Sequence, residues 1–130
     1  YEADAFTAAK AHYERGLAIL EKAFGPDHPN SEPALAGLAR VALATGRPAD
    51  ALQLAGRSVA AAEARGASEI DLADSRFVLA RALWDAPADA GRDRGRALAQ
   101  ARRARDAFRG LKEAEPQAAA VERWLAKRRD

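Results

Sequence analysis

The 130-residue chain contains no cysteine and no methionine, and aromatic residues make up only 6% of it. Without cysteine, neither a disulfide framework nor a thiolate-ligated metal site can form. β-Branched residues are scarce as well, which argues against a sheet. No apolar run approaches the roughly 20 residues that a membrane-spanning helix needs. We therefore expect a cytoplasmic protein with no membrane partner and, because the chain begins at Tyr1 rather than Met, a fragment.

Alanine supplies 36 of the 130 residues, and Leu, Arg and Glu are the other dominant types. These residues favour helices, and the small alanine side chain lets helices pack closely. The length is that of one domain. The 21 basic and 19 acidic residues leave a net charge of only +2, so the balance does not indicate a nucleic-acid partner.

Glycine and proline divide the sequence into six segments in which apolar residues recur at intervals of three and four. Gly25 followed by Pro26 ends the first segment, and Gly46 ends the second. Ser68 and Asp71 resemble a capping box at the start of the fourth. The pattern predicts helices over residues 3–24, 30–46, 48–66, 69–84, 92–110 and 115–129, with a loop over 85–91.

The segments repeat along the chain. Leu38-Ala39-Arg40 recurs 41 residues later as Leu79-Ala80-Arg81. Five residues of the first segment recur 42 residues later in the third: Ala9, Tyr13, Arg15, Leu17 and Glu21 correspond to Ala51, Ala55, Arg57, Val59 and Glu63. A helix pair that repeats at about 40 residues indicates a solenoid, in which stacking of neighbouring pairs completes the core.

Residues 9–25 and the turn Gly25-Pro26-Asp27-His28-Pro29 are followed by Leu38-Ala39, Gly46-Arg47 and Ala51-Leu52 at regular spacing. In these stretches the chain resembles tetratricopeptide repeats of the longer, kinesin-light-chain-like type, which repeat at about 42 residues. The resemblance covers about residues 9–110. It implies an all-α, antiparallel helix-pair solenoid with a right-handed superhelical twist. Independently of the resemblance, small side chains are expected where helices approach closely, at Ala9, Ala51, Ala97, Gly16, Ser58 and Ala104.

The resemblance divides a single domain, residues 1–130, into four parts. Residues 1–25 correspond to the second helix of a partial repeat, which suggests that further repeats precede Tyr1, and residues 30–66 form a repeat. Residues 69–110 form a degenerate repeat, since Arg76 falls at a usually apolar position. Residues 115–129 form a C-terminal capping helix, and its Trp124-Leu125-Ala126 is similar to the tails of bacterial multidomain signalling proteins such as Ser/Thr kinases.

The chain offers no group of residues that suits catalysis, a cofactor or a metal. The four serines fall at expected caps or packing positions, and Gly91 to Arg96 lacks the Lys-Ser/Thr ending of a phosphate loop. His28 is expected to be a turn residue. For His12, no His or carboxylate partner for metal binding can be predicted in its helix. The expected protein is not an enzyme and has no cofactor.

In the family that the chain resembles, the first helix of each repeat lines a concave groove that binds peptides. Arg40 and Arg81 would lie one repeat apart along this groove, where paired guanidinium groups suit a carboxylate. The alternatives are that each Arg pairs internally with Glu32 or Asp74 and that the aromatic residues pack on Trp124. The groove candidates are Arg40, Leu43, Asp74, Phe77, Arg81 and Trp84.

These observations predict a non-enzymatic scaffold that binds a peptide or a neighbouring domain, with a protein partner that carries acidic or carboxylate groups. The alternative is the repeat tail of a nucleic-acid-associated transcription regulator, for which the basic stretch 92–112 is the contact. We also expect self-association through the first helix, whose free face around Phe6 and Tyr13 should be apolar.

Overall fold

The computed structural model describes residues 2–26 and 28–128, with the side chains of Glu2 and Ala3 left aside. All regular structure within these ranges is helical, which confirms the all-α, helical-repeat fold class. Short 3₁₀ turns cover Pro29–Ser31, Ala88–Ala90 and Lys112–Ala114. The helices are α1 (Glu2–Phe24), α2 (Glu32–Ala44), α3 (Pro48–Ala64), α4 (Glu69–Asp85), α5 (Arg94–Arg109) and α6 (Glu115–Ala126). Asp27 of the expected turn and residue 129 of the expected capping helix lie outside the described residues.

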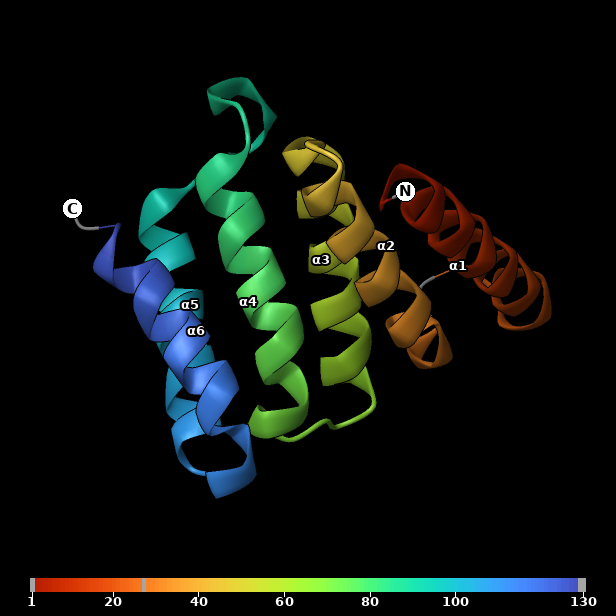
Figure 1. Cartoon of the computed structure of the whole chain (residues 1–130). Coiled ribbons are helices and arrows are strands. Elements are labelled where there is room, and N and C mark those ends of the chain that lie inside the picture. Colours follow the sequence, from red (N-terminus) through yellow and green to blue (C-terminus); the bar gives the residue numbers. More distant parts are fainter. Residues whose placement is uncertain (1, 27, 129–130) are drawn as a thin grey trace.

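The helices stack in chain order. Each helix packs against the next, and α2 also contacts α4. In Figure 1 the helices α2, α4 and α6 form the nearer layer, and α3 and α5 lie behind them. The first helices of successive pairs therefore share one side of the molecule.

The helix ends follow local signals that the sequence carries. Ser68 is the N-cap of α4, and its Oγ accepts a hydrogen bond from the Asp71 backbone N–H at 3.3 Å. Asp93 caps α5 in the same way, accepting from the Arg96 N–H at 3.0 Å. Gly46 follows α2 with a φ of +75°, in the left-handed region where glycine has no steric penalty. His28 is a turn residue, because its Nδ1 accepts from the Asn30 N–H at 3.1 Å.

Alanine contacts dominate the interior, as the composition predicts. Ala51 and Ala97 are completely buried, as are Ser58 and Ala104, which agrees with their expected positions at close helix contacts, whereas Ala9 is half-buried. The expectation for Gly16 is wrong, because a Cβ placed there would meet no atom within 4 Å. The close approach between α1 and α2 lies instead at Gly37, where a Cβ would collide with the ring of Tyr13.

The free face of α1 differs from the expected one. Tyr13 packs with Leu17 against Leu35 and Leu38 of α2, so the expectation that Tyr13 marks the free face is wrong. Tyr13 and Leu17 are one turn apart and therefore face the same neighbour. The large hydrophobic side chains that α1 exposes are Ile19, at 68%, and Phe24, at 53%. Self-association through this helix stays a prediction.

Candidate functional site

The six candidate groove residues lie on the neighbouring helices α2 and α4. Arg40 is exposed and Leu43 is half-buried on α2. On α4, Asp74 is exposed, whereas the other three side chains are half-buried: Phe77, Arg81 and Trp84. Because α2 contacts α4, the candidates occupy one continuous part of the molecule.

The two candidate aromatic rings both contact Trp124 of α6. The ring centroids of Phe77 and Trp124 are 5.9 Å apart at an interplanar angle of 88°, and those of Trp84 and Trp124 are 5.8 Å apart at 77°. These edge-to-face pairs stabilise the packing of α6 on α4. Phe77 and Trp84 therefore do pack on Trp124, as the alternative to a groove role expects. We call Phe77, Trp84 and Trp124 the aromatic cluster; each keeps part of its surface exposed.

Guanidinium groups surround the aromatic cluster. Arg81 Cζ lies 5.5 Å from the Phe77 ring centroid, and Arg94 Cζ lies 4.7 Å from that of Trp84. Arg128 Cζ lies 4.4 Å from the Trp124 centroid and 6.0 Å from that of Trp84. Burial lowers the pKa of Arg81, the charge of Arg128 lowers it further, and the charge of Asp85 opposes both effects.

Sequence reasoning did not find Arg94 or Arg128 as members of this site. Arg128 follows Trp124 by four residues, a spacing that would place both on one face of a continuing helix and is the signal that the sequence does contain, although α6 ends at Ala126. Arg94 Nε also donates to the Trp84 carbonyl at 3.4 Å. This contact joins α5 to the end of α4 and depends on how the two helices pack.

The expected internal ion pairs of Arg40 and Arg81 are not formed within the ranges that the structure describes, so that alternative is wrong there. Glu32, one of the expected partners, instead accepts a hydrogen bond from Ser75 Oγ at 3.3 Å. Ser75 Oγ also lies 3.1 Å from Ser58 Oγ. Both guanidinium groups therefore lack a carboxylate at salt-bridge distance among the described residues.

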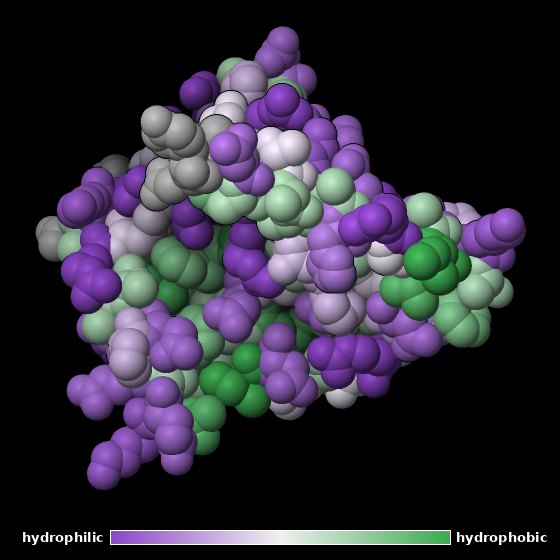
Figure 2. Space-filling model, turned by 45° about the vertical axis from the view of Figure 1, so that its right-hand side comes forward, coloured by the Kyte–Doolittle hydropathy of each residue, from purple (hydrophilic) through white to green (hydrophobic). Residues whose placement is uncertain are grey.

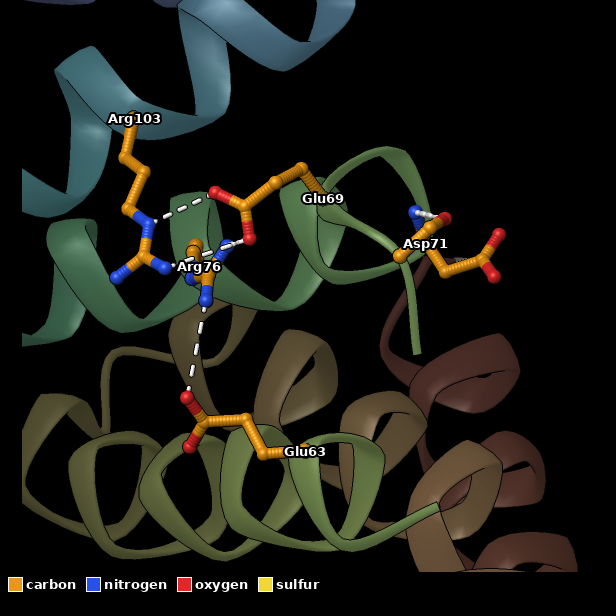
Figure 3. Close-up of polar contacts among 6 residues, drawn as sticks. Glu63, Glu69, Asp71, Arg76 and Arg103 are labelled. Carbon is orange, nitrogen blue, oxygen red and sulfur yellow. Dashed lines mark hydrogen bonds and ion pairs between the residues drawn. The ribbon is translucent and has the colours of Figure 1, made fainter. Parts of the chain in front are cut away.

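Arg76 forms the centre of a second charged group, at the position that the family resemblance marks as apolar. Its side chain is 2% exposed, and its Nη1 donates to Glu69 Oε2 at 2.7 Å. Its Nη2 lies 3.7 Å from Glu63 Oε2. Figure 3 shows Arg76 between Glu69 and Glu63, so one guanidinium joins α4 to α3.

Arg103 extends this group to α5. Its Nε donates to Glu69 Oε1 at 2.9 Å and its Nη2 to Glu69 Oε2 at 3.3 Å, as Figure 3 shows. Hydrogen bonds from Arg103 and Arg76 lower the pKa of Glu69 from 4.5 to about 2. The bond to Glu69 raises the pKa of Arg103. The residues act as a structural connection among α3, α4 and α5.

Several arginines of the basic stretch 92–112 also have carboxylate partners. Besides Arg103 with Glu69, Arg105 Nε lies 3.1 Å from Asp106 Oδ1, and Arg109 Nε lies 2.8 Å from Glu122 Oε1. The stretch is thus partly neutralised on the protein itself, which weakens its match to a polyanion.

A hollow of about 500 Å³ lies elsewhere, between α1, α2 and α3. Leu17, Leu38 and Leu54 line it, and Lys10 and Arg47 are among its charged lining residues. Figure 2 shows hydrophobic residues recessed between hydrophilic ones on one face of the molecule. None of the predicted groove residues lines this hollow, so it is separate from the aromatic cluster.

Stacked antiparallel helix pairs define the chain as a helical-repeat protein. Residues 1–64 match the family model of the tetratricopeptide repeat, and the chain is a tetratricopeptide repeat protein. A comparison with curated proteins gave no match. The resemblance to the kinesin-light-chain-like type and to tails of signalling proteins stays a prediction.

Tetratricopeptide repeats as a family mediate protein–protein interactions and are non-enzymatic scaffolds. Among the described residues, no helix is long and apolar enough to cross a membrane.

Proposed function

We propose that the chain is a scaffold that binds an acidic peptide segment of a partner protein on the surface formed by α2 and α4. The proposal rests on the positions of Arg40 and Arg81 and on their lack of salt-bridge partners in the part of the chain that the structure describes. They occupy equivalent positions one repeat apart, and neither has a salt-bridge partner among the described residues. The partner is either a separate protein or a neighbouring domain of the same polypeptide.

The chemistry of these side chains suits carboxylates. A guanidinium presents a planar set of donors that can hold a carboxylate by two parallel hydrogen bonds. Arg81 is half-buried against the Phe77 ring, so less water competes for its donors than at an exposed arginine. Arg40 is exposed and accessible to a second carboxylate of the same peptide.

Apolar contact would come from Leu43 and the aromatic cluster, all of which are half-buried. Aromatic residues and arginine are the residue types that most often dominate binding at interfaces. Asp74 lies on α4 two turns before Arg81 and is exposed. Its charge would repel an acidic residue, so a bound peptide should place a neutral or basic residue near Asp74 and its acidic residues near Arg81.

Selection of peptides by the protein itself tests this proposal. A random 12-residue peptide library displayed on phage is selected on the wild-type protein, and the affinity of the most enriched peptide is measured by fluorescence anisotropy. We expect enrichment in Asp and Glu, and a loss of about 1–3 kcal/mol in binding for Arg40→Ala or Arg81→Ala, typical of a charged hydrogen bond.

Arg102→Ala is the matched control, because Arg102 is exposed on α5. It removes the same charge from a helix outside the proposed surface and should leave the affinity unchanged, while circular dichroism confirms equal helix content in all variants. If the Arg40 and Arg81 double variant binds the selected peptide as well as the wild-type protein does, the proposal is wrong.

A further inference from the structure

Arg128 follows the last turn of α6 and has unmatched hydrogen-bonding capacity. Its Nη1 donates to the Trp124 carbonyl at 3.2 Å. Its Nε is buried and has no hydrogen-bond partner among the described residues. A buried donor without an acceptor is costly, and a charged one especially so. An acceptor from outside the chain would remove that cost if the side chain turns so that its Nε faces the acceptor.

Arg81 contacts a different ring of the same aromatic cluster. The guanidinium of Arg128 is 4.4 Å from the Trp124 centroid, that of Arg81 is 5.5 Å from the Phe77 centroid, and the two rings contact each other at 5.9 Å. The positive charge of Arg128 acts unfavourably on that of Arg81. Among the described carboxylates, that of Asp85 acts on Arg81, but not at salt-bridge distance.

We infer that Arg81 and Arg128 together form a carboxylate-binding site beside the aromatic cluster, which holds a Glu or Asp side chain of an acidic peptide. The inference rests on the proposed function and assigns one of its contacts to Arg128, just beyond α6, which sequence reasoning did not include in the groove. A carboxylate between the two guanidinium groups would accept from the buried Arg128 Nε and would offset the repulsion between the two positive charges.

The same surroundings exclude a cationic ligand. One face of each ring, Phe77, Trp84 and Trp124, is already covered by a guanidinium group, that of Arg81, Arg94 or Arg128. A Lys or Arg of the partner would meet like charges there and would have to displace one of them. An acidic group meets donors instead.

The two tryptophans provide a direct probe, because the chain contains only two and both belong to the aromatic cluster. Hexaglutamate with blocked ends is titrated into the full chain, and tryptophan fluorescence is recorded at low and high salt. We expect a saturable change with the wild-type protein, no change with blocked hexaglutamine, and an affinity about tenfold weaker for Arg128→Gln.

Arg123→Gln is the matched control, since Arg123 is exposed on α6 and the substitution removes the same charge. Arg128→Lys is a second variant in case Arg128→Gln lowers the stability of the protein. It keeps the positive charge but lacks the Nε donor, so it should bind hexaglutamate more weakly than the wild-type protein does. Equal affinities for the wild-type, Arg128→Lys and Arg128→Gln proteins would overturn the inference, as would equal losses for Arg123→Gln and Arg128→Gln.

The outcome also separates this inference from the proposed function. If phage selection yields peptides that depend on Arg40 while hexaglutamate leaves the fluorescence unchanged, the Arg81–Arg128 site is wrong and the scaffold proposal stands. If the selection yields no peptide that depends on Arg40 or Arg81, the proposed function itself is wrong.

Discussion

Arg76, whose side chain is 2% exposed, donates a 2.7 Å hydrogen bond to Glu69 on its own helix and reaches Glu63 on the preceding one. Its alkyl stem and guanidinium fill a position where the repeat pattern places an apolar residue. The polar end is satisfied because Glu69 and Glu63 stand at the ends of α4 and α3 that meet at the turn between them. The buried charge is thus compensated at the surface of the helix stack.

Arg76→Ala should destabilise the protein by about 2–4 kcal/mol, because it leaves a cavity of the size of the lost side chain. Arg76→Met keeps most of the volume and removes the desolvated charge, so its cost should be below about 1.5 kcal/mol. Urea unfolding followed by circular dichroism measures both. Equal destabilisation by the two substitutions would show that the ion pairs, not the packing, are what matters at this position.

Acid should weaken the Glu69 contacts in a defined range. The pKa of Glu69 falls from 4.5 to about 2 in the folded protein, so the unfolded chain binds more protons between these values and stability rises with pH across them. The contribution is present above about pH 4.5 and is lost as the pH approaches 2. Because the Glu69 side chain is 55% exposed, solvent screening keeps it to about 1 kcal/mol.

Unfolding measured from pH 2 to pH 6 for wild-type protein and Glu69→Gln checks this linkage. The stability difference between the two should grow with pH up to about 4.5 and then stay constant. Curves that run parallel over the whole range would contradict the assigned role of Glu69.

Replacing each of two glycines in neighbouring helices with alanine should change the stability of the protein in opposite directions. Gly37→Ala would force the Tyr13 ring to move and should cost about 1–3 kcal/mol. Gly16→Ala meets open space within α1 and should stabilise the protein by up to about 1 kcal/mol through helix propensity. Thermal unfolding of the two variants beside the wild-type protein is sufficient, and a stabilised Gly37→Ala would show that α1 does not approach α2 as described.

Trp124 should hold α6 on the helix stack. Trp124→Ala removes its ring contacts with Phe77 and Trp84 and should destabilise the protein by about 2–4 kcal/mol. Trp84 then becomes the single tryptophan, and its emission should shift to longer wavelength as water reaches the ring. Arg123→Ala on the same helix serves as the control, and an unshifted Trp84 emission would argue against the aromatic cluster.

The local features of the fold could be predicted from sequence because they are encoded locally. Ser68 caps the helix that it was expected to cap, and Gly46 lies just beyond α2 in the left-handed conformation. The spacing of three and four identifies α1 as amphipathic, but it does not show which neighbour covers the stripe. For that reason Tyr13 was expected on the free face and lies against α2 instead.

Residues whose roles depend on tertiary packing could not be found in this way. Gly16 and Gly37 are the same residue type in helices, and only the position of the Tyr13 ring distinguishes them. Arg128 becomes part of the candidate site because α6 brings it over Trp84 as well as Trp124. Arg40 and Arg81, in contrast, were identifiable because the repeat places them at equivalent positions.

The most direct test of the proposed scaffold function is amide chemical-shift mapping by NMR, with the ¹⁵N-labelled full chain and the most enriched selected peptide. The account predicts saturable shifts concentrated on α2, α4 and α6, around Arg40, Arg81 and Trp124, with little change on the outer surfaces of α3 and α5. Shifts that instead cluster on α1 and α3, around the hollow lined by Leu17, Leu38 and Leu54, would contradict it.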